Sequence, residues 1–200
     1  MTLDFPAGQE PDLWQPDPEE QTHRFVLGNV SRASIVDPPL IAICMNPSRA
    51  DRTQSDKTVN RLIEASTDNG YPGWIMLNLY PQRATKPSDL SPFDSGLSAA
   101  NCAAIEQTLL RFQVVEVLGA WGGQSHKTLR QAKPSVLDTL DRLGVRLYMW
   151  DGLTKTGNPF HPTPRRSPLL MQGTKRYLTR IGNRHEEVKL GSTGTSTVVS

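Results

Sequence analysis

Runs of consecutive apolar residues mark the interior of this chain. Residues 40–45 (LIAICM) and 74–79 (WIMLNL) are apolar with almost no interruption. Runs of this length are typical of strands that are buried on both faces of a sheet. Residues 114–118 and 145–150 have the same character and predict two further strands, and residues 24–30 predict a first one.

Apolar residues at helical spacing lie between these runs. Residues 57–69 carry apolar side chains on one face, Asp56 can cap the start of that helix, and Gly70 can close its end. The same reasoning predicts helices over residues 96–112, capped by Asp94 or Ser95; over 127–131 and 135–143, broken at Pro134 and closed by Gly144; and over 167–181.

The alternation of strands and helices predicts an α/β fold, a three-layer α/β/α sandwich with a mostly parallel central sheet. We expect a single domain over residues 23–186. Residues 1–22 are acidic and proline-rich and are interpreted as an N-terminal tail. Residues 187–200 are rich in Gly, Ser and Thr and predict a disordered tail.

Composition excludes several classes of protein. The two cysteines, Cys44 and Cys102, are too few for a four-thiolate iron–sulfur cluster, and no Cys/His spacing resembles a zinc site, so we expect neither metal nor cofactor. Both cysteines fit small apolar side chains in a reducing compartment. No apolar run approaches the roughly 20 residues of a membrane span, and no signal peptide is recognised. The sequence therefore predicts a soluble cytoplasmic protein without a membrane partner.

The formal net charge is only +2, but it is unevenly distributed. Residues 1–20 carry six acids and no lysine or arginine, whereas residues 152–185 carry seven basic residues and no acid. A basic face of this kind suits a polyanion such as nucleic acid. A solvated basic surface without a partner explains the same pattern, and the sequence does not separate the two.

Four segments follow the predicted strands, and in parallel sheets ligands bind outside the carboxyl ends of the strands. The first, residues 46–56, begins with Asn46-Pro47-Ser48-Arg49, where the proline fixes the direction of Asn46. That amide is able to hold a water or a substrate edge, or to close the strand in an Asx-type turn. Asp51 and Asp56 follow, and each is able to polarise a water, although Asp56 also fits a helix cap.

The other three segments are equally unusual for plain connections. Asn78 interrupts an apolar strand, and its buried amide must either brace a neighbouring loop or read a ligand. Trp121 sits among glycines that permit close backbone approach, and either packs under a site or belongs to the core. His161 is held among prolines, which makes its imidazole rigid and suited to stabilising charge on a leaving group. No GxGxxG, P-loop or GxSxG motif occurs.

Five short motifs together resemble a family catalogued as domain of unknown function 1643. They are Asn46-Pro47-Ser48 with Ala50; Asp56-Lys57-Thr58; Asn78-Leu79-Tyr80-Pro81; Trp121-Gly122; and Gly157-Asn158-Pro159-Phe160-His161-Pro162. The resemblance covers residues from about 23 to 172 and leaves the ends of the chain uncovered. It implies a fold and a site, and no reaction.

The order of these loops is also distantly similar to the uracil-DNA glycosylase superfamily. That resemblance implies that Asn46 positions the attacking water, with help from Asp51 or Asp56, while Asn78 reads the base and His161 stabilises it. Thr163 stands where that superfamily has serine. The implied substrate contacts extend to Pro47, Tyr80 and Trp121, and the implied phosphate contacts are Ser48, Arg49, Thr163, Arg165 and Arg166.

The function expected from this resemblance is hydrolysis of the N-glycosidic bond of a damaged or modified base, with DNA a better candidate than RNA. Two alternatives remain open at this point. One is a nucleic-acid or nucleotide binding protein that keeps the pocket but not the reaction. The other is an enzyme that acts on a free, modified nucleotide.

Overall fold

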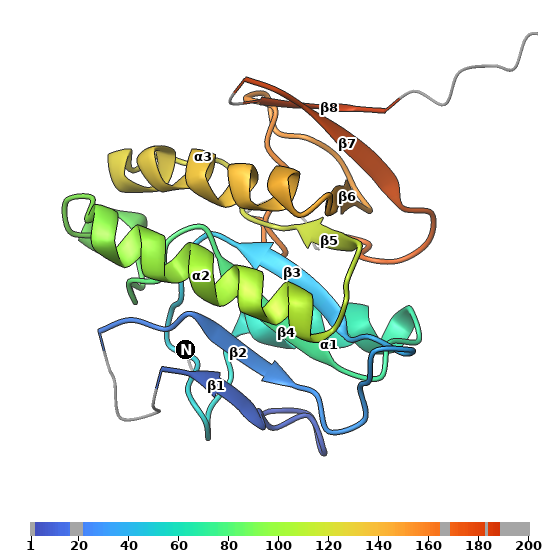
Figure 1. The fold of residues 1–200 in the computed structure, drawn as a ribbon. Coiled ribbons are helices and arrows are strands. Elements are labelled where there is room, and N and C mark those ends of the chain that lie inside the picture. Colours follow the sequence, from blue (N-terminus) through green and yellow to red (C-terminus); the bar gives the residue numbers. More distant parts are fainter. Residues whose placement is uncertain (1–2, 17–21, 165–168, 183, 189–200) are drawn as a thin grey trace, which may run out of the picture.

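A computed structural model describes residues 3–16, 22–164, 169–182 and 184–188. Its centre is one sheet in the order β1-β2-β4-β3-β5-β6-β7-β8 (Figure 1). The strands are β1 (Leu13–Gln15), β2 (Val26–Asn29), β3 (Leu40–Cys44), β4 (Trp74–Asn78), β5 (Glu116–Gly119), β6 (Arg146–Met149), β7 (Arg176–Ile181) and β8 (Arg184–Glu187). The helices are α1 (Lys57–Asp68), the short η1 (Pro87–Asp89), α2 (Ser95–Arg111) and α3 (Lys127–Arg142).

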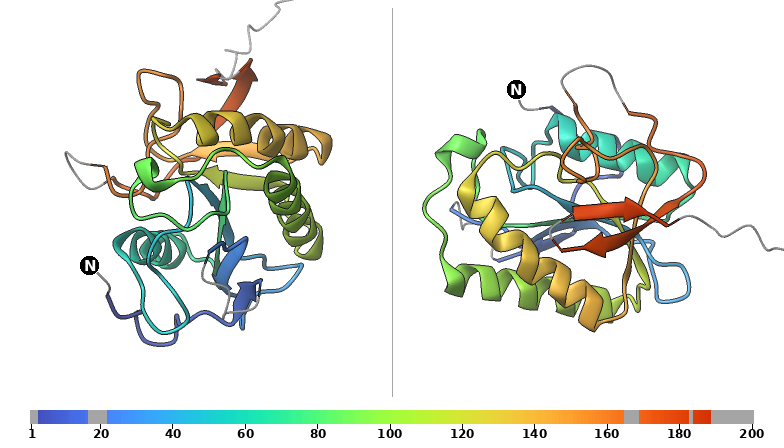
Figure 2. Two further views of the ribbon diagram at one scale, coloured as in Figure 1. Left: turned by 90° about the vertical axis from the view of Figure 1, so that its left-hand side faces the viewer. Right: turned by 90° about the horizontal axis from the view of Figure 1, so that it is seen from above.

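Helices cover both faces of the sheet. Helix α1 packs with one set of strand side chains, including Leu40 and Trp74. Helices α2 and α3 pack with the opposite set, including Ile41 and Ile75. Successive strand residues therefore enter different cores, as the pleat requires. Figure 2 shows the sheet and the helices on its two faces from the side and from above.

The predicted α/β class is confirmed, but the prediction of a mostly parallel sheet is wrong. Among the described strands, only the central ones, β4-β3-β5-β6, run parallel. The four remaining pairings, β1-β2, β2-β4, β6-β7 and β7-β8, are antiparallel. The sheet is mixed because hairpin-like strands extend a parallel centre on both sides. The parallel centre still gathers the carboxyl ends of four strands at one edge.

Two of the added strands lie where the sequence predicted something else. Residues 167–181 were expected to be helical, yet β7 occupies Arg176–Ile181. Neighbouring side chains explain the difference, because Tyr177 packs against the α1 core and Leu178 against the opposite one. A strand places consecutive residues on opposite faces, whereas a helix does not. At the other end, β1 and the buried Phe5, which stacks on Trp74, belong to the segment interpreted as a tail.

The break expected at Pro134 is also wrong, because α3 continues from Lys127 to Arg142 through that proline. A proline inside a helix leaves the carbonyl four residues earlier, here that of Arg130, without its usual partner. Arg130 is exposed, so water can reach the group. Burial of one face of α3, including Leu129, Val136 and Leu137, holds the helix together across the defect.

Other boundaries follow the sequence closely. Asp56 caps α1 by accepting hydrogen bonds from the backbone of Thr58 and Val59, and Asp94 caps α2. Gly70 and Gly144 have positive φ where the helices end. Cys44 is buried and Cys102 half-buried, and neither forms a disulfide within the described chain. In the described part of the chain, no helix is both long and apolar enough to cross a membrane.

Candidate functional site

A cavity of about 390 Å³ opens at the carboxyl ends of β3 and β4, beside the loop that carries His161. Its volume falls within the range of small-molecule sites. The lining combines three loops with the sheet: Arg24, Cys44, Met45, Asn46, Ser48, Asp56, Thr58, Met76, Ala84, Thr85, His161 and Thr163. Five of the predicted site residues therefore meet at one cavity: Asn46, Ser48, Asp56, His161 and Thr163.

Asn46 is held so that its oxygen is left for a ligand. Its Nδ2 donates to the backbone oxygens of Pro47, at 3.0 Å, and Ala84, at 2.9 Å. The backbone N–H of Ala84 in turn donates to the Pro47 oxygen, at 2.9 Å. With both amide protons engaged, Oδ1 is the acceptor that Asn46 presents, and no described residue occupies it. The Asx-type turn considered from the sequence is replaced by this contact with Ala84.

His161 is fixed in one tautomer by its own loop. Its Nδ1 accepts from the backbone N–H of Thr163 at 3.2 Å and lies 3.1 Å from the Thr163 hydroxyl. A nitrogen that accepts an N–H carries no proton, so in the neutral ring the proton is on Nε2. Burial lowers the pKa of His161, which keeps the ring neutral at neutral pH. The side chain is thus a neutral donor at the cavity.

Close packing between two loops explains the glycines after β5. Gly122 has φ +68° and donates its N–H to the Pro159 oxygen at 2.8 Å. A Cβ on Gly122 would lie 2.9 Å from His161 Cβ, and one on Gly119 would lie 2.7 Å from Pro159 Cγ. Neither distance is tolerable, so these glycines allow the His161 loop to rest directly on the end of β5.

Trp121 lies beneath this loop, in the core, and does not line the cavity. Its Nε1 donates to Asn158 Oδ1 at 3.0 Å, and Lys133 Nζ donates to the same oxygen at 2.7 Å. Burial, followed by the nearby charge of Arg180, lowers the pKa of Lys133 to about 8. The Trp121 ring also contacts His185, with 5.6 Å between ring centroids. Of the two interpretations of Trp121, the structure supports core packing.

The two acids considered from the sequence have different positions. Asp56 lines the cavity and caps α1 at once, because Oδ1 takes the two helix N–H groups while Oδ2 has only a 3.4 Å contact from Ala50 N. Asp51 does not line the cavity, and its Oδ1 accepts from the backbone of Thr53 and Gln54 within a tight turn. Partial burial opposes these hydrogen bonds, which nevertheless lower the pKa of Asp51.

Asn78 and Tyr80 also lie outside the cavity lining. Asn78 is fully buried, and both its amide nitrogen and its oxygen lack a partner within the described chain. Because Met76, two residues before it, lines the cavity, strand alternation turns the Asn78 side chain to the same face of the sheet. Tyr80 is buried in a separate cluster, where its hydroxyl accepts from the backbone of Asp94 at 3.1 Å. It supports the start of α2.

The residues expected to hold phosphates are divided in the same way. Ser48 and Thr163 line the cavity, and Pro47 is buried behind it. Arg49 lies outside, at a shallower hollow of about 270 Å³ that it lines together with Lys57. This hollow shares Ser48, Asp56, Thr58 and Thr85 with the cavity, so the two are continuous. Arg165 and Arg166 lie outside the described residues.

Part of the basic stretch at residues 152–185 is neutralised in the fold. Three of its seven basic residues form ion pairs with acids: Lys175 with Glu116, Arg176 with Glu187, and Arg180 with Asp138 and Asp141. These pairs range from partly buried to exposed. Exposed pairs contribute little to stability, but all of them remove local excess charge. For these residues the structure favours a paired surface over a polyanion-binding face.

The sequence did not indicate Arg24, which is fully buried and lines the cavity. Nη1 donates to the Ala50 oxygen at 2.6 Å, and Nη2 approaches the Met76 sulfur at 3.8 Å. Arg24 Nε has no partner in the described chain. Burial, then repulsion from Arg83, lowers the pKa of Arg24 to about 10. The only sequence signal was a charged residue at the start of a predicted strand, which is ordinarily solvent-exposed.

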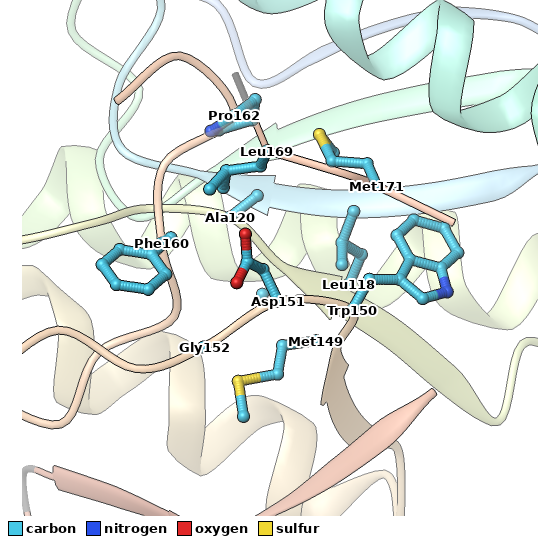
Figure 3. Close-up of a pocket in the computed structure, with 11 residues that line it drawn as sticks. Leu118, Ala120, Met149, Trp150, Asp151, Gly152, Phe160, Pro162, Leu169 and Met171 are labelled. Atoms are coloured by element: carbon cyan, nitrogen blue, oxygen red, sulfur yellow. The ribbon is translucent and has the colours of Figure 1, made fainter. Parts of the chain in front are cut away.

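A neighbouring hollow at the ends of β5 and β6 is too small for a ligand. It holds about 20 Å³, roughly the space of one water, and is lined mainly by apolar side chains such as Phe160, Leu169 and Met171. Figure 3 shows these side chains and Trp150 gathered around it. The hollow is a packing gap under the His161 loop and is not a candidate site.

Comparison with known proteins gives one match. The family described as "Protein of unknown function (DUF1643)" matches residues 24–163. No curated protein and no solved structure matches the chain. The first and last matched residues, Arg24 and Thr163, both line the cavity, so the matched segment contains the complete candidate site.

Proposed function

The chain belongs to the DUF1643 family, whose function is unknown, and we propose that its cavity hydrolyses the N-glycosidic bond of a damaged or modified nucleotide in DNA. The observation that carries the proposal is the pairing of a neutral donor with a free acceptor at one cavity. His161 presents its Nε2 proton, and Asn46 presents its Oδ1. The distant resemblance to the uracil-DNA glycosylase superfamily supports the same roles.

The reaction breaks the bond between C1′ of the sugar and the base nitrogen. The bonding electrons leave with the base, which becomes an anion, and positive charge develops on the sugar. A fixed, neutral N–H donor stabilises that anion without reorganising, and this is the role we assign to His161 Nε2. A doubly protonated imidazolium does not fit here, because Nδ1 accepts the Thr163 N–H and a proton on Nδ1 would remove that hydrogen bond.

The attacking water requires acceptors for its protons. This mechanism uses two oxygens of the lining that are able to accept further hydrogen bonds, Asn46 Oδ1 and Asp56 Oδ2. A water that donates to both directs its lone pair into the cavity. As the bond from its oxygen to C1′ forms, one proton of the water passes to the Asp56 carboxylate. The base anion then takes up one proton from solvent, and Asp56 releases its proton to solvent, which restores the carboxylate. The products are an abasic sugar and the free base.

The outer part of the site suits the phosphates of DNA, and the inner part suits a base. A base that rotates out of a duplex enters a pocket while its phosphates stay at the surface. Arg49 and Lys57, at the shallow hollow beside the cavity, are placed to meet these phosphates. Asn78 remains our candidate for reading the base, because its unpaired amide on the cavity side of β4 is able to form hydrogen bonds once a ligand is bound.

An abasic-site assay tests the proposal. Single- and double-stranded DNA carrying uracil, hypoxanthine, mismatched or hypermodified bases is incubated with the protein, then treated with alkali. We expect strand breaks at one class of base, with an equal amount of free base detected by chromatography. Intact DNA throughout the panel, together with measurable and salt-sensitive binding, would show a binding protein in place of an enzyme.

Two substitutions at Asp56 separate its two roles. Asp56→Asn keeps a good helix cap but removes the carboxylate, so the free energy of unfolding should change by only a few tenths of a kcal/mol. Loss of a general base should lower the rate of base release by about 10²–10⁴-fold. Asp56→Ala should lose the same activity and also about 1 kcal/mol of stability. Urea unfolding and the abasic-site assay measure the two effects, and full activity in Asp56→Asn would restrict Asp56 to capping.

A further inference from the structure

Arg24 is the most unusual charged side chain of the cavity. None of its surface is exposed. Asp56 and Asp51 lie near enough to raise its pKa slightly, but neither forms an ion pair with its guanidinium. A guanidinium has five N–H donors, and here one meets the Ala50 oxygen and another meets only the weakly accepting sulfur of Met76. The buried Nε–H has no hydrogen-bond partner among the described residues.

The surroundings of Arg24 keep it charged and in place. The ring of Trp14 lies 5.5 Å from Arg24 Cζ, close enough for a cation–π contact. Arg83 donates to the same Ala50 oxygen at 3.2 Å, and its Nη1 is also buried without a partner. Although burial lowers the pKa of Arg24 to about 10, the group stays protonated at neutral pH. Two guanidinium groups therefore converge behind the cavity with donors to spare.

We propose that Arg24 is the oxyanion-binding residue at the inner wall of this cavity, and that the ligand places a negatively charged or charge-developing oxygen against it. A buried charge that lacks a partner is costly, and an anionic oxygen satisfies the free donors of Arg24 as no residue of the described chain does. This inference deepens the proposed function and rests on it for the assignment of the cavity as the substrate site.

Two sources supply such an oxygen. In a flipped nucleotide the base enters first, so Arg24 would meet a carbonyl oxygen that becomes anionic as the base leaves. A free nucleotide is able to enter with its phosphate first, because no polymer holds that phosphate outside. The chemistry at Arg24 is the same in both cases. Binding measurements distinguish them, because only the second source depends on the phosphate.

The test is isothermal titration of the full-length protein with nucleosides, with their 5′-monophosphates and with inorganic phosphate. Arg24→Met, which keeps the length of the side chain but removes its charge, should weaken binding by about 10- to 100-fold. The control is Arg32→Met. Arg32 is exposed and follows β2, whose carboxyl end pairs with the start of β4, at the opposite edge of the sheet. We expect this control to bind as the wild type does.

The probes identify the source. Tighter binding of monophosphates than of nucleosides, lost in Arg24→Met, assigns the phosphate. Equal binding of both, again lost in Arg24→Met, assigns the base oxygen. Unchanged binding in Arg24→Met, or no binding of any probe by the wild type, overturns the proposal. Base release is measured separately. The test of anion binding and the test of glycosidic cleavage therefore succeed or fail independently.

Stability provides a second and independent readout. If Arg24 serves a ligand, Arg24→Met should melt at or above the temperature of the wild type, because it removes an unpaired buried charge. If Arg24→Met does not fold, Arg24→Lys takes its place in the titration, and its compact ammonium should bind the same probe more weakly. Failure of both variants to fold would make Arg24 a structural residue and would reject the inference.

Discussion

Replacing His161 with alanine should lower the rate of base release by about 10²–10³-fold, the usual effect of removing one preorganised donor. The variant should still fold, because the backbone contacts of the loop, from Gly122 to Pro159 and from Phe160 to Gly152, do not involve the imidazole. Substrate affinity should change less than the rate, since the donor acts mainly on charge that develops in the transition state. Single-turnover assays of wild type and variant measure both quantities.

The dependence on pH follows from the tautomer. Burial lowers the pKa of His161 below its ordinary value of 6.5, so the neutral ring persists as the pH falls through 6.5. If the neutral Nε2–H is the donor, activity should hold below pH 6.5 and fall only when the pH reaches the lowered pKa. Folding stability should also fall at acid pH. In the unfolded chain His161 has its ordinary pKa, so it binds a proton at a higher pH than in the folded chain, and acid favours unfolding.

A matched control isolates this effect. His126 caps α3 through its ring nitrogen, 3.4 Å from the backbone N–H of Thr128, and does not line the cavity. His126→Asn supplies another capping side chain and should leave both the rate and the pH profile unchanged. A His161→Ala protein with the wild-type rate, or an acid limb at or above pH 6.5 in the wild type, would falsify the assignment.

The sequence located the centre of the fold because that part is determined locally. The apolar runs that became β3 and β4 are buried on both faces, and Asp56 caps the helix as its side chain predicts. The antiparallel strands were not predictable in the same way. β1 is three residues long, and β7 is only half-buried, so neither has an apolar pattern that separates it from a loop or a helix.

The same distinction applies to the site. Asn46, Ser48, Asp56 and His161 were identified because they follow strands in chain order, and strand ends meet at one edge of the sheet. Arg24 lies two residues before β2, which runs antiparallel to β4, so its approach to the cavity depends on a pairing that the motifs do not encode. Trp121 was grouped with the site for its position after β5, although side-chain direction places it in the core.

The largest effect on stability is expected at Trp121. Trp121→Ala should lower the free energy of unfolding by about 3–5 kcal/mol, because it opens a cavity among fully buried side chains and removes the Nε1 hydrogen bond to Asn158. The loss should reach the site as well. Asn158 stands three residues before His161 and depends on Trp121 and Lys133 for the partners of its oxygen. Urea unfolding at several temperatures measures the change.

Trp121→Phe separates the loss of the N–H from the loss of the ring, and it tests whether Trp121 contacts the substrate. It keeps most of the ring but loses the N–H, while Lys133 still occupies the Asn158 oxygen, so the cost should be near 1 kcal/mol. A core residue of this kind should alter unfolding more than substrate affinity. If Trp121→Phe instead raised KM strongly at unchanged stability, the ring would contact the substrate, and the cavity would have to extend beneath the His161 loop when a ligand binds.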